Sequence, residues 1–334
     1  MKIGLDIGYS SVKIAYGDGT YPEQVQLPVG AGPERLCGVG IDGSVARGHG
    51  HQVVIDGEPW VAGVDPSRLT QFVPCMDASY SSSSEYRALF YAALAEVGAP
   101  VVDFLVTGLP VTHFLDSAHR KRLEALMTGT HHIREGLTVE VGKAVVVPQP
   151  AGAFTALLLD RRVDQNVFTV QPDASVLVVD PGHYSLDWVI FHRSFNMDSS
   201  GSTSIAGERI VRQAADLLSQ RHGVRVPVQK LQEAVLHNAG PLVVGRHLIE
   251  FWPAMKEVAR DSIRANLTAL RGSVRQVTDT RGVDVVLVTG GGAKLFQDSL
   301  AEAFPEAHVI AMREPVTANA RGFFAYCGQL AAQK

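Results

Sequence analysis

The chain has 334 residues, of which 46% are hydrophobic and 19% are charged, and its formal net charge is -4. That length suits two domains, each large enough to bury its own core. The acidic balance gives no electrostatic reason to expect direct, tight binding to DNA, so any role on nucleic acid would need an adaptor.

Cysteine usage and hydropathy indicate where the protein works. The three cysteines, Cys37, Cys75 and Cys327, are far apart and lack the Cys-x-x-Cys spacing of a metal or redox site. No signal-peptide pattern and no apolar run of about 20 residues is present. We therefore expect a cytoplasmic protein that neither is exported nor spans a membrane.

The chain opens with KIGLDIGYSSVKIAY, residues 2–16, which predicts two strands joined by a sharp turn. Asp6 ends the first strand, and Gly8 permits the tight backbone that turns N–H groups toward an anion. Lys13 adds a positive charge. A strand that ends in Asp-x-Gly is also typical of an ordinary hairpin turn, so this copy alone leaves both interpretations open.

Residues 20–75 alternate short apolar pieces, such as Val25 to Leu27, with Gly, Pro and Asp, which predicts a small β-rich subdomain. His49 and His51 could bind a metal there, but we favour a Gly-rich loop because no acidic or Cys ligand is nearby in sequence. The serines from Ser79 onward offer helix N-caps for an amphipathic helix that ends at Gly98.

Strands and helices then alternate: a strand over 101–109, a charged helix over 116–127, a strand over 139–147 and a helix over 151–160. His131 and His132 fall between two of these elements, and we expect them in a solvated loop. Pro148 and Pro150 flank Gln149 and hold it at a strand end with little backbone freedom. A polar connector, residues 161–173, leads into the second half.

The second half begins with VLVVDPGHYSLDWVI, residues 176–190, which repeats the opening motif. The turn residues match in pairs: Asp6 with Asp180, Gly8 with Gly182, and Ser11 with Ser185. Two matched copies favour a phosphate-holding role over two ordinary turns. We expect the hairpins to grip a polyphosphate from both sides, with Asp6 and Asp180 holding a hydrated Mg²⁺ and with backbone amides and Lys13 holding phosphate oxygens.

The remaining elements are predicted from apolar spacing: a polar loop over 198–204, helices over 205–220, 228–238 and 242–270, a strand over 283–289, a helix over 293–304, a strand at 309–310 and a helix over 315–326. Pro253 is expected to kink or divide the longest helix. Gly290 to Gly292 let a ligand lie on the backbone at a helix N-terminus, although a tight turn alone also explains them. Their pattern matches neither G-x-G-x-x-G nor the P-loop.

In this order the segments resemble the actin-like ATPase superfamily over nearly the whole chain. The segments VTGLPV, PQPAGA and VTGGGA are most similar to bacterial plasmid-segregation actins of the ParM/StbA group, which includes the D protein of the plasmid PRTRC system. The resemblance implies an α/β, actin-like (ribonuclease H-like) duplicated two-domain fold with a nucleotide in the interdomain cleft. Domain I would hold residues 1–160, with the β-rich subdomain and a C-terminal helix at 313–334 packed back on it, and domain II would hold 161–312.

The resemblance also assigns five motifs: a first phosphate loop (Asp6 to Lys13), a first connector (Pro148 to Ala153), a second phosphate loop (Asp180 to Asp187), an adenosine loop (Val288 to Phe296) and a second connector (Ala318 to Phe324). It implies that Gln149 orients the attacking water and acts with Asp6 and Asp180 in catalysis, since phosphoryl transfer depends on positioning and charge stabilisation. The implied ATP- or ADP-binding residues are Gly8, Tyr9, Ser10, Ser11, Lys13, Gly182, His183, Tyr184, Ser185, Glu208, Arg212, Gly290, Gly291, Gly292 and Lys294. Glu208 and Arg212 would lie near the ribose and adenine. His183 and Tyr184 depart from relatives that often carry glycine or threonine.

The function that the resemblance implies is a Mg²⁺-dependent ATPase whose ATP hydrolysis governs a homopolymeric filament. The filament would segregate or position plasmid DNA through a DNA-binding adaptor. Two alternatives stay open. One is a non-polymerising sugar or carboxylate kinase of the same superfamily, which would need an aspartate base and a longer second domain. The other is a nucleotide-binding scaffold with little hydrolysis, against which Gln149 argues.

Overall fold

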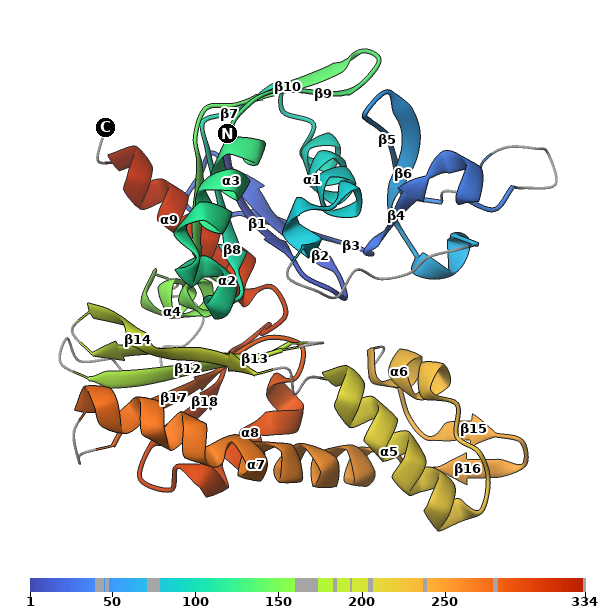
Figure 1. The fold of residues 1–334 in the computed structure, drawn as a ribbon, viewed down its shortest axis with the longest axis vertical. Helices are drawn as coiled ribbons and strands as arrows, with labels where there is room; N and C mark the ends of the chain where they lie inside the picture. Colours follow the sequence, from blue (N-terminus) through green and yellow to red (C-terminus); the bar gives the residue numbers. More distant parts are fainter. Residues whose placement is uncertain are drawn as a thin grey trace. The chain divides into compact units, whose positions relative to one another are not determined.

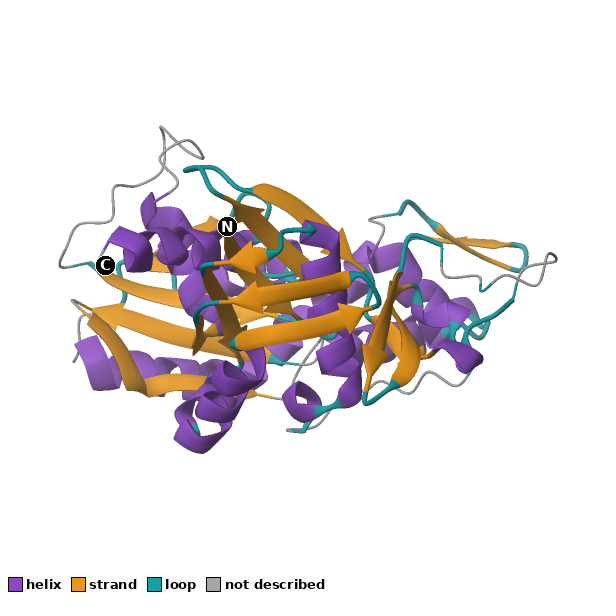
Figure 2. Ribbon diagram, turned by 90° about the horizontal axis from the view of Figure 1, so that it is seen from above, coloured by secondary structure: helices purple, strands orange, loops and turns teal. Residues whose placement is uncertain are grey.

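The computed structural model describes residues 1–39, 45, 48–70, 79–159, 174–182, 185–192, 194–203, 207–236, 239–278 and 282–332. The chain divides into two compact units, one of Met1–Phe168 with Val316–Lys334 and the other of Thr169–Pro315. Each unit is built on a five-stranded mixed sheet flanked by helices (Figures 1 and 2). The expected domain boundary at 160/161 lies outside the described residues. Among the described helices, none is both long and apolar enough to cross a bilayer.

The sheet of the first unit has the order β11-β8-β1-β2-β3. Its strands are β1 (Lys2–Ile7), β2 (Val12–Gly17), β3 (Glu23–Leu27), β8 (Phe104–Leu109) and β11 (Ala144–Pro148). β8 pairs in parallel with β1, and β11 pairs in parallel with β8. On the other side, β2 pairs antiparallel with β1, and β3 pairs antiparallel with β2. Every residue from Ile3 to Ile7 is buried, which is typical of a strand covered on both faces.

Helices α4 (Gln149–Leu159) and α9 (Ala318–Ala332) pack backbone to backbone within the first unit. A Cβ placed on Gly322 of α9 would lie 1.7 Å from the carbonyl oxygen of Gly152 in α4, and one on Gly4 of β1 would lie 2.1 Å from the carbonyl oxygen of Ala320. The Ala153 N–H also donates to Asn319 Oδ1 at 3.1 Å. The segments that the resemblance assigns as connectors are therefore in direct contact.

We expect Gly322→Ala to destabilise the protein by about 3 kcal/mol, because the added methyl group overlaps the α4 backbone and the two helices must separate. Gly328→Ala on the same helix is the matched control, since nothing lies within 4 Å of its added Cβ. The control should keep or raise stability, because alanine favours a helix over glycine. Urea unfolding of both variants measures the difference, and equal midpoints would refute the close contact.

In the described part of the first unit, two smaller sheets and three further α-helices accompany the main sheet. One sheet contains β4 (Gly30–Pro33), β6 (Glu58–Val64) and β5 (His51–Ile55), and the other contains β7 (Val101–Val102), β10 (Leu137–Val141) and β9 (Gly129–Arg134). The helices are α1 (Ser84–Val97), α2 (Val111–Leu115) and α3 (Ser117–Met127). The predicted caps of α1 are confirmed: the Tyr86 N–H donates to Ser83 Oγ, and Gly98 ends the helix with φ of 66°.

Several local predictions for the first unit are wrong. Val25 to Leu27 belong to β3 of the main sheet, and the single strands expected over 101–109 and 139–147 are each split between two sheets. His51 lies in β5, where its Nε2 is 2.6 Å from Glu96 Oε2. The expected solvated loop at His131 and His132 is strand β9, whose residues alternate between buried and exposed.

The side chain of His131 is one of the buried ones in β9. Its ring packs edge-on against Phe90 and Tyr91 of α1, and burial lowers the pKa of the imidazole. His132 takes the exposed side and contacts Thr138 Oγ1 at 3.1 Å. A polar residue thus entered the core because the period-2 pattern of the strand, and not its own polarity, decides the direction of the side chain.

The sheet of the second unit has the order β14-β13-β12-β17-β18. Its strands are β12 (Ser175–Pro181), β13 (Leu186–His192), β14 (Ser194–Thr203), β17 (Val285–Val288) and β18 (His308–Ala311). β13 pairs antiparallel with β12, and β14 pairs antiparallel with β13. On the other side, β17 pairs in parallel with β12, and β18 pairs in parallel with β17. Order and directions repeat those of the first unit strand for strand, so the predicted duplicated α/β fold is confirmed.

The helices of the second unit are α5 (Gly207–His222), α6 (Val228–Leu236), α7 (Trp252–Thr278) and α8 (Ala293–Ala303), and a small hairpin joins β15 (Leu242–Val244) to β16 (His247–Ile249). A single apolar cluster, which includes Trp188, Phe251 and Phe296, joins helices to sheet. The Trp188 Nε1–H also donates to Ser273 Oγ of α7 at 3.0 Å.

Three predictions for the second unit are wrong. Residues 198–203 of the expected polar loop belong to β14, and residue 204 lies outside the described residues. The helix expected over 242–270 is the β15–β16 hairpin followed by α7. Gly245 makes the hairpin turn with φ of 58°, a backbone that suits glycine. Pro253 does not kink the helix but is its second residue, where the N–H that proline lacks has no partner inside a helix.

Candidate functional site

The predicted hairpin at the start of the chain is confirmed, and it brings two charged side chains together. The β1–β2 register places Asp6 directly opposite Lys13, and Lys13 Nζ lies 3.5 Å from Asp6 Oδ2. Both side chains are largely buried, at 3% and 10% exposed. The Gly8 N–H donates to the Ser11 carbonyl at 3.1 Å and so closes the turn. Ser10 is exposed at its tip.

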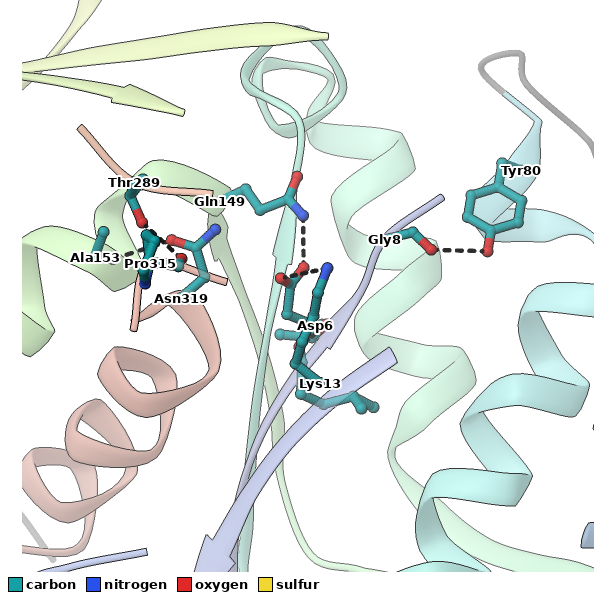
Figure 3. A network of polar contacts seen from close by, with 11 residues as sticks. Asp6, Gly8, Lys13, Tyr80, Gln149, Ala153, Thr289, Pro315 and Asn319 are labelled. Carbon is teal, nitrogen blue, oxygen red and sulfur yellow. Dashed lines mark hydrogen bonds and ion pairs between the residues drawn. The ribbon is translucent and has the colours of Figure 1, made fainter. Parts of the chain in front are cut away.

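Gln149, the first residue of α4, meets the same aspartate. Its Nε2 donates to Asp6 Oδ1 at 2.6 Å, and the oxygen end of the amide turns away from Asp6 (Figure 3). Asp6 is thus held on one oxygen by an ammonium group and on the other by an amide. The structure therefore joins the two first-unit residues that the sequence singles out for catalysis.

A residue that the sequence analysis missed contacts this turn. The ring of Tyr80 stacks on that of Tyr9 with centroids 4.8 Å apart, and its hydroxyl donates to the Gly8 carbonyl at 3.5 Å. No local pattern marks Tyr80, which precedes Ser83, the N-cap of α1. The position of a tyrosine near the start of a helix does not predict a contact with a residue 72 positions away.

The second hairpin repeats the turn of the first but changes its charges. The Gly182 N–H donates to the Ser185 carbonyl at 2.8 Å, the same closing bond as in the first copy. Asp180 lies opposite Asp187, and both are buried. Ser185 Oγ donates to Asp187 Oδ2 at 2.5 Å. An aspartate thus stands where the first hairpin has its lysine.

His183 and Tyr184, between Gly182 and Ser185 in the sequence, lie outside the described residues.

Gly290 and Gly292, which follow β17, allow the backbone to approach the second hairpin closely. Gly290 has φ of +74°, and a Cβ there would lie 2.0 Å from Asp180 Oδ1. The Gly292 N–H donates to the Pro181 carbonyl at 2.9 Å. A close contact therefore explains these two glycines. Gly291 differs, because nothing lies within 4 Å of its added Cβ.

The Pro315 carbonyl holds the segment at the end of β17 in place. It accepts hydrogen bonds from the Gly290 N–H at 3.0 Å and from Thr289 Oγ1 at 3.2 Å. Lys294 is exposed in the first turn of α8, which begins after Gly292. Exposed backbone at Gly291 and a lysine nearby suit a phosphorylated or polar ligand at the start of this helix.

The remaining predicted residues lie on α5 of the second unit. Arg212 is exposed one turn after Glu208, whose side chain is not among those described. The described residues contain no group of three or more His, Cys, Asp or Glu side chains that could hold a metal ion.

Two family models match the chain in succession. Residues 4–152 match the N-terminal domain of actin-like proteins, and residues 178–302 match the C-terminal domain of an archaeal actin homologue, described as MreB-like. No curated protein matches the chain significantly.

Solved structures share the fold over nearly the full length. Ta0583, an archaeal actin homologue, is 22% identical with a TM-score of 0.74, covering 98% of this chain and 99% of its own. Its complex with ADP is matched at 20% identity and a TM-score of 0.70, covering 98% and 100%. A ParM protein from a 15-stranded filament of Clostridium botulinum is 16% identical with a TM-score of 0.70, covering 98% and 99%.

Proposed function

Because this chain belongs to the actin-like proteins, we propose that it binds and hydrolyses ATP and assembles with copies of itself into filaments. The observation that carries the nucleotide part is the repeated hairpin. Each copy has an aspartate as the second-last residue of a buried strand and closes its turn with a glycine N–H that donates to a serine carbonyl. Such tight turns direct backbone N–H groups to an anion, so two copies suit a polyphosphate better than a single phosphate.

The donor atoms fit a magnesium ion that accompanies the nucleotide. Asp6 and Asp180 offer buried carboxylate oxygens, which are the hard ligands that Mg²⁺ prefers. When bound, the ion would neutralise charge on the phosphates. The protein would supply the rest: Lys13 and the turn amides bind phosphate oxygens, and Gln149 accepts a hydrogen bond from the attacking water through Oε1.

The assembly part of the proposal is supported by solved relatives that are themselves filaments, including the ParM filament of Clostridium botulinum. We propose a homopolymer in the cytoplasm that segregates or positions plasmid DNA. The net charge of -4 agrees with a link to DNA through a basic adaptor and not through the monomer itself.

Release of inorganic phosphate from ATP tests the enzymatic part. Purified protein should release phosphate with Mg²⁺ and stop when the metal is chelated. A panel of sugars and carboxylates should leave ATP turnover unchanged; an acceptor that raises turnover and becomes phosphorylated would indicate a kinase. Tight nucleotide binding without phosphate release would indicate a scaffold.

A further inference from the structure

We propose that Tyr80 is a positioning residue that holds the first phosphate-binding turn, Gly8 to Ser11, in the shape that receives phosphate. This inference rests on the proposed nucleotide function. Tyr80 lies in a single 3-10 turn (Tyr80–Ser82) just before α1, far from the hairpin in sequence. Its ring and its hydroxyl both contact the turn.

The first contact holds the side chain at the tip of the turn. The rings of Tyr80 and Tyr9 are 4.8 Å apart with an angle of 25° between their planes, which is a stacked arrangement. Aromatic pairs of this geometry attract beyond their simple burial. The stack therefore resists rotation of Tyr9 away from its place, and with it rotation of the backbone on either side.

The second contact sets the direction of one peptide group. The Tyr80 hydroxyl donates to the Gly8 carbonyl at 3.5 Å, a long hydrogen bond, as Figure 3 shows. A trans peptide is planar, and its C=O and N–H point in opposite directions. When the Gly8 carbonyl faces Tyr80, the N–H of Tyr9 in the same peptide faces the other way. Tyr80 thereby selects the side of the turn to which this N–H is presented.

A third contact ties Tyr80 to the core of the first unit. The rings of Tyr86 and Tyr80 are T-shaped to each other, with centroids 5.2 Å apart and 89° between their planes, and Tyr86 is only 2% exposed within α1. The Ser83 cap fixes the backbone between them, because Ser83 Oγ accepts from the Tyr86 N–H at 3.1 Å. The turn is thus held by a chain of rings that starts in a buried helix. A turn held in place before binding loses less conformational entropy when phosphate arrives.

Calorimetric titration with ADP and with adenosine tests this role, because only ADP carries phosphates for the turn. We expect Tyr80→Ala to raise the Kd for ADP about 10-fold and to leave the Kd for adenosine within about twofold. Tyr80→Phe keeps the stacked ring and loses only the long hydrogen bond, so it should raise the Kd for ADP about threefold. The control is Tyr16→Phe, which removes a hydroxyl that donates to Glu23 at 3.0 Å at the other end of β2. It should match wild type.

The outcomes separate the two claims. If wild type binds neither ligand, the proposed function fails and this inference fails with it. If wild type binds ADP but both Tyr80 variants match it, the inference alone is wrong. Equal losses for ADP and adenosine would show that Tyr80 only maintains the fold, which also overturns the inference. Thermal unfolding of each variant checks folding, and Tyr80→Phe provides the answer if Tyr80→Ala does not fold.

Discussion

Asp180→Ala is expected to reduce Mg²⁺-dependent ATP hydrolysis to below about 1% of the wild-type rate. Asp180 is the second-last residue of β12 and is buried, with Gly290 packed against its carboxylate. The variant removes the oxygens proposed to hold the metal, so charge on the phosphates is no longer neutralised. Nucleotide binding through the turn amides should persist in weakened form, which separates a loss of chemistry from a loss of the site.

Asp298→Ala is the control for that variant. Asp298 is an aspartate of the same unit that lies 2.8 Å from Lys256, and its side chain is 62% exposed on α8. Exposed pairs contribute little to stability, so this variant should fold and hydrolyse ATP as wild type does. Wild-type turnover in Asp180→Ala, measured as phosphate release at saturating ATP, would refute the metal assignment.

Gln149→Ala is expected to slow hydrolysis about 10²-fold while ATP affinity stays nearly intact. The amide is proposed to orient water, and it does not have to hold the phosphates. Its Nε2 donates to Asp6 at 2.6 Å, which turns the accepting oxygen outward and fixes the side chain for that task. Slower hydrolysis should also prolong the life of assembled protein after a pulse of ATP. Single-turnover phosphate release and a separate ATP titration measure the two effects.

The control for Gln149 is another glutamine that donates to a carboxylate. Gln52 lies in β5, and its Nε2 is 3.1 Å from Glu34 Oε2. Gln52→Ala should leave both hydrolysis and affinity unchanged. Unchanged turnover with collapsed affinity in Gln149→Ala would instead show that Gln149 only supports the carboxylate of Asp6.

Local patterns predicted the two hairpins because their determinants are close in sequence. Asp6, Gly8 and Ser11 lie within one turn, and the same spacing recurs at Asp180. The contact between Gln149 and Asp6 spans 143 residues, so only resemblance to a family could suggest it. The stack of Tyr80 on Tyr9 carries no sequence signal at all.

The wrong predictions of secondary structure also have physical causes. Apolar residues between 242 and 270 fit a helical period, yet Gly245 gives positive φ and turns the first part into the β15–β16 hairpin. Short apolar runs fit either structure, and the glycine decides between them. β10 ends at Val141 and β11 begins at Ala144 in a different sheet, and the break at Gly142 and Lys143 is too short to show in a segment that is otherwise rich in valine.

Light scattering against protein concentration tests the central claim, that ATP governs assembly of this chain. With Mg²⁺ and ATP, scattering should rise only above a threshold concentration, and ADP should raise that threshold. For a shift of about 10-fold in the threshold, the free energy of assembly per subunit has to differ by only about 1.4 kcal/mol between ATP-bound and ADP-bound protein. Electron microscopy of the same samples should show filaments above the threshold. A field without filaments across a wide range of protein, salt and nucleotide concentrations would contradict the account.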